Sequence, residues 1–315
     1  MQRLEITMNK PNQRCYGRHC VAITSPDRIL FPKDKITKLE LIDYYEKIAP
    51  TMLPYMKNRI LTMQRFPEGI EGEAFYQKDI PEYFPAWIKR VPVARSDGGI
   101  VHYMVCENSA GLVYLANAAC ITPHLFLSKI DKLHYPDMMI FDLDPSKKND
   151  FATVKKVAFI VKDVLEALGL VPFVKTTGSR GVHVQVPLMR KQNYDEVKNF
   201  ARSIAELIVA HYPALTTLEM RKAKRGGKIF IDYLRNSFTA TAVAPYAVRA
   251  HPGAPVAMPI TWDDLKKPSL NPQSYTIRNV FKRLDEQGDA WKGMQRSAKS
   301  LAKAMKLLQA HIERE

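Results

Sequence analysis

The chain has 315 residues, of which 46% are hydrophobic and 25% charged, a composition typical of a globular protein with a large core. Lys and Arg outnumber Asp and Glu by 47 to 32, so the formal net charge is +15, which favours a polyanionic partner such as nucleic acid. No run approaches the roughly 20 apolar residues of a membrane span, and residues 1–10 lack the apolar core of a signal peptide. These features exclude a helical membrane protein and predict a cytoplasmic, nucleoid-associated protein without a membrane partner.

The four cysteines are few for this length and are typical of a protein in a reducing compartment. Cys15, His19 and Cys20 resemble half of a zinc site, but no matching second pair follows them. We therefore expect these residues, together with Cys106 and Cys120, to be structural or incidental.

The first part of the chain predicts an irregular arm followed by a strand and a helix. Residues 1–20 are polar and indicate a flexible arm, and residues 21–24 are strand-like. Thr37 is followed three residues later by a glutamate, which is the pattern of a capping box, and apolar residues then recur at helical spacing. Pro50 and Pro54 are expected to end this helix.

The later elements alternate between strands and helices. The strand over 182–188 alternates valine with His183 and Gln185, which predicts a half-buried strand with a polar functional face. The expected elements are strands over 62–67, 103–106, 138–145, 171–177, 182–188 and 228–233, and helices over 109–119, 151–168, 194–211 and 297–312. From residue 138 to 233, their order is that of a βαββαβ-like unit, a sheet with helices on one face.

The strand over 138–145 carries an Asp-x-Asp pair at its end. Side chains alternate along a strand, so Asp142 and Asp144 share one face while Phe141 and Leu143 take the other. Two carboxylates on one face repel each other unless a cation lies between them, and Mg²⁺ and Mn²⁺ prefer such oxygen ligands. A solvated pair at the start of a turn is the alternative interpretation.

A third carboxylate stands in a similar position. Asp232 ends the apolar strand over 228–233, as Asp142 does in its own strand. If the two strands are neighbours, the three aspartates could hold two divalent ions and support in-line phosphoryl transfer. A single aspartate at a strand end is otherwise more often a turn residue.

A glycine-rich turn precedes His183. The segment 178–183, Gly-Ser-Arg-Gly-Val-His, exposes backbone N–H groups, and Ser179, Arg180 and His183 add side-chain donors for an anion. The pattern is neither GxGxxG nor a P-loop, so it predicts neither a Rossmann cofactor site nor Walker-type hydrolysis. A simple hairpin turn remains the alternative.

Basic and aromatic residues form a third group of candidates for nucleic-acid contact. Five positive charges lie within residues 221–228, close to Asp232, and several lysines surround the start of the helix after Thr37, a favourable place for a phosphate. Aromatic residues interleave with basic ones between residues 75 and 90, as a surface that stacks on bases requires. The residues singled out are Arg225, Arg235, Asn236, Arg249, Lys33, Lys35, Lys38, Phe75 and Tyr76.

Taken together, these motifs resemble the archaeo-eukaryotic primase superfamily, and within it the polymerase domain of bacterial and archaeal ligase D. The resemblance spans roughly residues 21–290 and rests on several unrelated motifs that occur in the order of the family. They are Ser25–Asp34, the helix start at 37–38, Phe141–Pro145, Gly178–His183, Phe230–Tyr233 and Ala244–Arg249.

The resemblance implies an α+β primase-polymerase fold, in which an RRM-like catalytic module is clasped to an N-terminal α/β module. The implied catalytic domain covers residues 21–295, with the N-terminal module at about 21–130, the RRM-like module at about 131–250 and a helical part to 295. A flexible arm (1–20) and a basic helical tail (296–315) flank it.

The resemblance also implies an activity and its partners. Members add nucleotides to DNA 3′ ends and often prefer ribonucleotides. Their substrates are NTPs or dNTPs, and they use two divalent ions, Mn²⁺ or Mg²⁺. They fill short gaps and ends in non-homologous end joining and recognise a downstream 5′-phosphate. Gapped or overhanging DNA, Ku and a DNA ligase are the implied partners.

Roles are carried over to the matching positions of this sequence. Asp142, Asp144 and Asp232 are the implied catalytic metal ligands. The implied nucleotide-binding residues are Ser179, Arg180, His183, Arg249, His124 and Asn236, and the implied DNA-binding residues are Lys38, Arg28, Lys33, Phe75, Tyr76 and Arg225. The family often has lysine where this chain has Arg28 and Arg180, and a basic residue where it has Gln64.

Two other functions compete with this interpretation. A phosphatase of the haloacid dehalogenase class would use Asp142 as nucleophile and Asp144 as acid, with Lys175 as its later lysine, but the sequence lacks the required acidic pair. A non-catalytic DNA-binding module would account for the charge, but not for three aspartates at strand ends.

Overall fold

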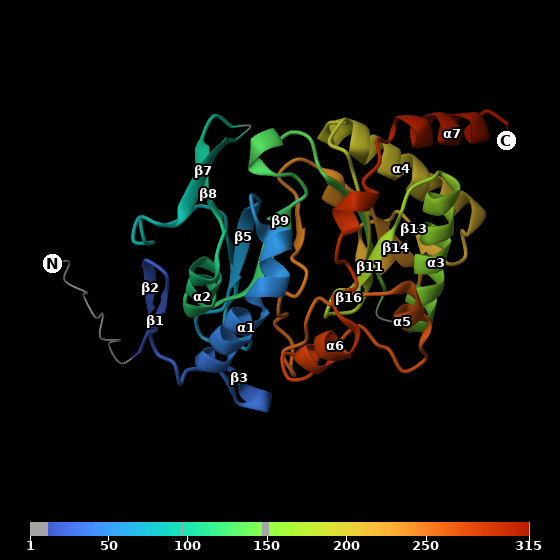
Figure 1. Cartoon of the computed structure of the whole chain (residues 1–315). Coiled ribbons are helices and arrows are strands. Elements are labelled where there is room, and N and C mark those ends of the chain that lie inside the picture. Colours follow the sequence, from blue (N-terminus) through green and yellow to red (C-terminus); the bar gives the residue numbers. More distant parts are fainter. Residues whose placement is uncertain (1–11, 96, 147–150, 315) are drawn as a thin grey trace.

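The computed structural model describes residues 12–95, 97–146 and 151–314. Two modules lie side by side, and each is built on a β-sheet with helices packed against it (Figure 1). This arrangement confirms the α+β fold expected from the sequence. None of the helices in the described residues has the length and apolarity of a membrane span.

The N-terminal module is built on an antiparallel sheet with strand order β15-β9-β5-β8-β7, and β6 pairs with β5. Helix α1 packs against α2, and α2 packs against β9. The strands are β5 (Ile60–Arg65), β6 (Phe75–Gln77), β7 (Lys89–Ala94), β8 (Ile100–Val105), β9 (Cys120–Phe126) and β15 (Thr241–Val243), and the helices are α1 (Lys38–Met56) and α2 (Ser109–Asn117).

The second module contains the expected βαββαβ order. Its sheet has the strand order β13-β14-β10-β12-β11-β16, and α3 and α4 pack on one face of it. The elements are β10 (Met138–Asp144), α3 (Phe151–Ala167), β11 (Phe173–Thr176), β12 (Val182–Pro187), α4 (Tyr194–His211), β13 (Thr216–Thr217), β14 (Ile229–Asp232) and β16 (Pro259–Ile260). Strand β16 extends this sheet beyond residue 250, the expected end of the module.

Apolar residues of β10 decide which face carries the site. Phe141 and Leu143 are fully buried with the valines of α3, so this face of the sheet is covered by helices. Asp142 and Asp144 alternate with them and therefore lie on the opposite face, toward the N-terminal module.

That opposite face is not open to solvent, which corrects the prediction for residues 182–188. All six residues of β12 are buried, and His183 and Gln185 are only 4% and 2% exposed. The strand alternates as the sequence indicates, but the polar face is covered. Lys175 of β11 also lies in this interior and donates to the carbonyl of Val243 in β15, so it joins the two sheets.

Helix α1 does not end at its prolines. It runs from Lys38 to Met56 with Pro50 and Pro54 inside it, and Thr37 and Glu40 form the predicted capping box. Each proline removes one backbone hydrogen bond. Apolar side chains are buried along the whole helix, and this burial outweighs the lost hydrogen bonds. Tertiary packing often overrides local helix propensity in this way.

The N-terminal residues 13–22 form a hairpin rather than the expected arm and separate strand. Strands β1 (Gln13–Tyr16) and β2 (His19–Ala22) pair around Gly17, whose positive φ of 59° suits the tight turn. Cys15 lies directly opposite Cys20 and forms a disulfide with it, so these cysteines have a structural role. The rest of the predicted arm, residues 1–11, lies outside the described residues.

The C-terminal segment returns to the second module. The expected helix over 297–312 is replaced by a 3-10 turn (Met294–Ser297) and α7 (Ala302–Ile312), because Lys299 exchanges backbone hydrogen bonds with Pro187 and Met189 at the end of β12. The remaining elements are β3 (Ile29–Phe31), β4 (Ile36–Thr37), α5 (Trp262–Lys266) and α6 (Val280–Gln287).

A buried ion pair connects the two sheets. Arg59, just before β5, donates two hydrogen bonds of 2.6 Å to Asp137, just before β10, and both side chains are at most 3% exposed. Removing one partner leaves the other charge buried without compensation.

We predict that Arg59→Met lowers the free energy of unfolding by about 3–5 kcal/mol, because Asp137 then remains buried with only the longer 4.0 Å contact to Lys129. The double variant Arg59→Met/Asp137→Leu should lose clearly less, since neither charge remains. Urea unfolding followed by circular dichroism measures both. Equal losses in the single and double variants would contradict this account of the pair.

Candidate active site

Strand pairing brings the three predicted aspartates together at one end of the second sheet. Strands β10 and β14 are antiparallel neighbours, and Asp142 lies directly opposite Asp232. Asp144 follows two residues later on the same face as Asp142. The motif order in the sequence thus becomes a cluster of carboxylates in space.

Asp142 and Asp232 share one cation. The Nε atom of Arg235 lies 3.4 Å from Oδ2 of Asp142 and 3.3 Å from Oδ2 of Asp232. On the other side, Nε2 of His183 lies 3.4 Å from Oδ1 of Asp142. The backbone N–H of Leu234 donates to Oδ1 of Asp232 at 2.9 Å. Both carboxylates are therefore fixed in direction.

Asp144 contacts two arginines, one exposed and one buried. Arg180 approaches Oδ1 at 3.2 Å from the glycine-rich turn and is 40% exposed. Arg225 contacts Oδ2 at 2.9 Å, is 4% exposed, and also donates to the carbonyls of two residues in its own loop. We predicted that Arg225 contacts DNA, but in this structure its guanidinium is buried and holds Asp144 in place.

The pKa values of Asp142 and Asp232 are shifted in opposite directions. Burial alone would raise the pKa of Asp142, but His183, Arg235 and Arg249 lower that pKa well below its ordinary value. Burial and the neighbouring Asp142 raise the pKa of Asp232. Asp142 is consequently ionised at neutral pH, and Asp232 is the group whose charge most needs a nearby cation.

Burial governs the two histidines of the site. It lowers the pKa of His183 to about 4, with the charge of Asp142 acting against that shift. His124 has its pKa lowered well below the ordinary value by burial and by Arg249 and Arg235. Both imidazoles are therefore neutral at pH 7, and His183 serves Asp142 as a hydrogen-bond donor.

The donor set fits a divalent cation. Among residues 12–95, 97–146 and 151–314, no three His, Cys, Asp or Glu side chains lie close enough together to hold an ion as they stand. The guanidinium of Arg235, however, already occupies a position between Asp142 and Asp232 as a cation would. Carboxylate oxygens on one face are the ligands that Mg²⁺ and Mn²⁺ prefer.

The glycine-rich turn packs tightly beside this cluster. A Cβ atom on Gly181 would lie 2.0 Å from the carbonyl oxygen of Leu143, and one on Gly178 would lie 2.8 Å from Arg249. Gly178 also has a φ of 63°. Only glycine allows the turn to approach β10 this closely.

The turn and the segment beside it carry side chains with hydrogen-bond donors and positive charge. The hydroxyl of Ser179 lies 2.9 Å from Nε2 of His251, and Arg249 donates to the carbonyl of Thr177 at 2.7 Å. The predicted residues Ser179, Arg180 and Arg249 therefore gather within one turn and its neighbour, next to Asp144.

A pocket of about 180 Å³ opens between the two modules at this point. Its walls include Tyr76 and His124 from the N-terminal module and Asp142, His183 and Arg249 from the second. Nε2 of His124 and Nδ1 of His183 are buried and have no hydrogen-bond partner within the described chain. Leaving buried polar atoms unpaired costs free energy, so a ligand that forms hydrogen bonds with these two atoms would be stabilised.

Asn236 has a different role from the predicted contact with nucleotide. Its side chain is fully buried, accepts from the backbone N–H of Ile140 at 2.9 Å, and donates to the carbonyl of Ile140 at 2.7 Å. A second donation goes to the carbonyl of Tyr233 at 2.8 Å. The amide therefore satisfies the backbone of Ile140 in β10, beyond the residues of β10 that pair with β14.

A second basic site lies at the start of α1, away from the carboxylates. The Nζ atom of Lys38 donates to the hydroxyl of Thr24 at 3.0 Å and to the carbonyl of Asn117 at 3.2 Å. Burial and the nearby Arg28 lower the pKa of Lys38 to about 8. Arg28 itself donates to Glu68 at 3.0 Å, and Lys33 is exposed on the following turn.

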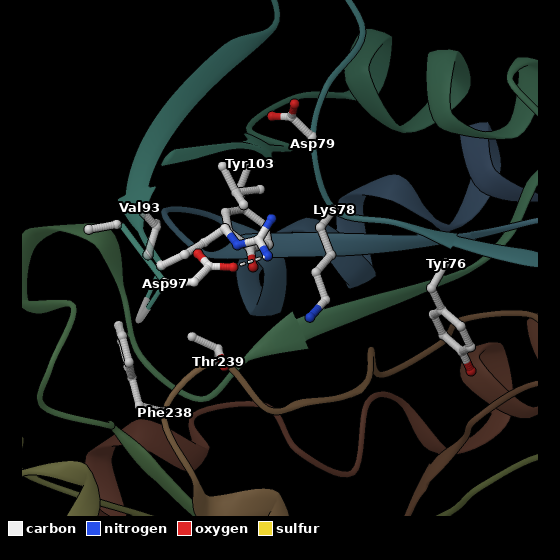
Figure 2. A pocket seen from close by; sticks show the side chains of 11 residues that line it. Tyr76, Lys78, Asp79, Val93, Asp97, Tyr103, Phe238 and Thr239 are labelled. Atoms are coloured by element: carbon white, nitrogen blue, oxygen red, sulfur yellow. Dashed lines mark hydrogen bonds and ion pairs between the residues drawn. The ribbon is translucent and has the colours of Figure 1, made fainter. Parts of the chain in front are cut away.

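The two predicted stacking residues lie on β6. Phe75 and Tyr76 are both exposed, Arg65 lies over the ring of Phe75 at 5.5 Å, and Tyr76 packs edge-on against His124 at 5.5 Å. Figure 2 shows a larger pocket of about 880 Å³ that Tyr76 also lines, with Lys78 pointing into it.

Sequence reasoning missed the role of Arg235 in the carboxylate cluster and the hydrogen bonds that Lys38 donates to Thr24 and Asn117. Arg235 stands three residues after Asp232, which is a spacing that brings side chains together in a helical turn and could have been noticed. Lys175, which the phosphatase interpretation requires, is fully buried and donates to the carbonyl of Val243. Its hydrogen-bond partner is therefore a backbone carbonyl and not an aspartate, although the charge of Asp142 also acts on it.

Stability should depend on pH through His183. Because its pKa is lowered to about 4 in the folded protein, the unfolded chain binds more protons between pH 6.5 and 4, and the free energy of unfolding falls as the pH falls through this window. The contribution is at most about 3 kcal/mol. We predict that His183→Gln flattens this part of the urea-unfolding profile, and an unchanged slope would contradict the burial of a neutral imidazole.

The comparisons with known proteins agree with this geometry. The model of the family described as "LigD, primase-polymerase domain" matches residues 37–291. The chain is 33% identical over 266 residues to the bifunctional non-homologous end joining protein LigD of Bacillus subtilis, which covers 84% of this chain and 42% of that protein. For the multifunctional non-homologous end joining DNA repair protein LigD of Mycobacterium tuberculosis, the identity is 32% over 277 residues, covering 85% and 36%.

A solved structure extends the likeness to three dimensions. The "Polymerase Domain from Mycobacterium tuberculosis Ligase D in complex with DNA" matches with a TM-score of 0.82 and 31% identity, covering 88% of this chain and 99% of that one. The chain thus spans less than half the length of the two curated relatives, but nearly all of this solved domain. The resemblance expected from the sequence is confirmed, and the chain belongs to the family of LigD primase-polymerase domains, which are nucleotidyltransferases.

Proposed function

We propose that this chain is a DNA-repair polymerase that adds nucleotides, preferably ribonucleotides, to DNA 3′ ends during non-homologous end joining. The observation that carries the proposal is the cluster of Asp142, Asp144 and Asp232 beside an anion-binding turn and a pocket of about 180 Å³. A phosphatase or a simple DNA-binding module does not account for that combination.

The carboxylates would hold two divalent ions, Mn²⁺ or Mg²⁺. Bound ions would lower the barrier by activating the primer 3′-hydroxyl and by neutralising charge on the leaving pyrophosphate. The chain's own contribution is to keep Asp142 ionised and to hold its direction through the neutral His183. Arg225 holds the direction of the Asp144 carboxylate.

The incoming nucleotide, an NTP or dNTP, would lie in the pocket between the modules. Ser179, Arg180 and Arg249 supply donors for its triphosphate, and Arg180 is exposed enough to turn from Asp144 toward a phosphate. The unpartnered Nε2 of His124 suits a sugar hydroxyl. A ribose offers one more hydroxyl than a deoxyribose, which supports the proposed preference for ribonucleotides.

DNA would contact both modules. Lys38, with Arg28 and Lys33 nearby, forms a basic site that suits the 5′-phosphate of the downstream strand. Phe75 and Tyr76 present exposed rings on which a template base could stack. The larger pocket in Figure 2 continues from Tyr76 and offers Lys78 to a phosphate of an unpaired strand.

The proposed partners follow from this activity. They are gapped or overhanging DNA with a 5′-phosphate, Ku and a DNA ligase. The relatives are described as end-joining proteins, which supports this set of partners. A cytoplasmic, nucleoid-associated location is part of the same proposal.

Primer extension tests the proposed activity. On a gapped duplex with a downstream 5′-phosphate and Mn²⁺, the wild-type chain should extend a labelled primer, and Asp142→Asn should reduce the rate at least about 10³-fold because a metal ligand is lost. Asp163→Asn, a matched change at an exposed aspartate of α3, should leave the rate unchanged.

The result also separates the competing functions. Absence of extension by the wild-type chain with either metal would contradict the polymerase proposal. Release of inorganic phosphate from a small phosphomonoester, abolished by Asp142→Asn, would instead support the phosphatase.

Lys38 gives a second prediction. Lys38→Met should remove most of the stimulation by the downstream 5′-phosphate, about tenfold, because one charge-assisted contact is lost while the buried stem is preserved. Lys57→Met, at the exposed opposite end of α1, is the matched control.

Because the pKa of Lys38 is lowered to about 8, the stimulation by the 5′-phosphate should also weaken as the pH rises from 7 to 9. Rates on substrates with and without the 5′-phosphate measure both effects. Equal stimulation in wild type and Lys38→Met would contradict this assignment of the phosphate site.

A further inference from the structure

Arg235 is the exposed arginine that contacts both Asp142 and Asp232. It lies in the short 3-10 turn Leu234–Asn236, directly after β14, and its Nε atom is 3.4 Å from Asp142 and 3.3 Å from Asp232. Its side chain is 45% exposed. Within the described part of the chain, these two carboxylates are the only ion-pair or hydrogen-bond partners of its guanidinium.

Arg225 provides the contrast. Its guanidinium is 4% exposed and is fixed by the backbone carbonyls of Glu219 and Met220 as well as by Asp144. Arg225 is therefore part of the folded framework. Arg235 reaches the cluster from the solvent side and can leave without breaking a backbone contact.

The two carboxylates do not depend on Arg235 for their positions. Asp232 accepts from the N–H of Leu234 at 2.9 Å, and Asp142 is held by His183 at 3.4 Å. They also lie opposite each other in neighbouring strands, so their negative charges need a cation between them. Removing Arg235 would leave a preorganised pair of carboxylates.

We propose that Arg235 is an internal cation that competes with a divalent metal ion for the space between Asp142 and Asp232. This inference rests on the proposed function, which assigns these carboxylates to metal binding. A guanidinium and a metal ion cannot occupy the same position, so metal binding must displace Arg235. Because Arg235 also lines the pocket of about 180 Å³, the displaced guanidinium stays beside the proposed nucleotide site.

The test is direct Mn²⁺ binding to the full chain without DNA or nucleotide, with free Mn²⁺ measured by electron paramagnetic resonance. Arg235→Gln should bind Mn²⁺ about tenfold more tightly than wild type, the change expected from two partly exposed ion pairs. Arg235→Lys should bind a few-fold more tightly, because the lysine Nζ lies one bond further from the backbone than the Nε atom that contacts both carboxylates.

Two further variants complete the design. Arg202→Gln removes an exposed arginine of α4 paired with Glu206, and its Mn²⁺ affinity should equal that of wild type. Asp142→Asn should abolish tight binding. Thermal unfolding adds a second measure, because metal-free Arg235→Gln should melt below wild type and should gain more from added Mn²⁺.

The outcomes separate the inference from the proposed function. If Asp142→Asn abolishes binding but Arg235→Gln and Arg235→Lys bind like wild type, the competition is overturned while the metal site stands. If Asp142→Asn binds Mn²⁺ like wild type, or no variant binds it, both the site and the competition are overturned.

Discussion

The need to neutralise three carboxylates at one end of a sheet governs the architecture of the site. Strand pairing places Asp142 opposite Asp232, and side-chain alternation adds Asp144 to the same face. Partial burial makes their mutual repulsion stronger than it would be in water. The arginines nearby meet that constraint in two ways: Arg225 is built into the fold, whereas Arg180 and Arg235 are exposed and available for other partners.

The second module could not present this cluster alone. The face of its sheet that carries the aspartates is covered by the N-terminal module. The interior between them combines polar groups with apolar contacts, such as Ile140 with Leu127 and Ala242. Arg59 with Asp137, and Lys175 with the carbonyl of Val243, join the two sheets across this interior. Burial by the facing module also keeps His183 neutral, so the protonation state of this residue depends on the packing of the two sheets.

Much of the fold could be predicted from local patterns. The capping box at Thr37, the periodicity of α4 and the strand ending at Asp232 are found where the sequence indicates them, because each is a short-range signal. Burial is not a local property, so the continuation of α1 through Pro50 and the covered face of β12 were not predictable. For the same reason, Arg225 and Asn236 looked like ligand contacts in the sequence, whereas each binds a distant part of the chain, Asp144 and Ile140 respectively, in addition to its local partners.

The most direct test of the account is a crystal structure of the chain soaked with Mn²⁺ and a non-hydrolysable nucleoside triphosphate. The anomalous signal of manganese locates the ions independently of any activity. We expect manganese bound by oxygens of Asp142, Asp144 and Asp232 at roughly 2.0–2.3 Å, with the guanidinium of Arg235 moved away from Asp142 and Asp232. Manganese bound elsewhere, with Arg235 still between these two carboxylates and the triphosphate outside the pocket, would contradict it.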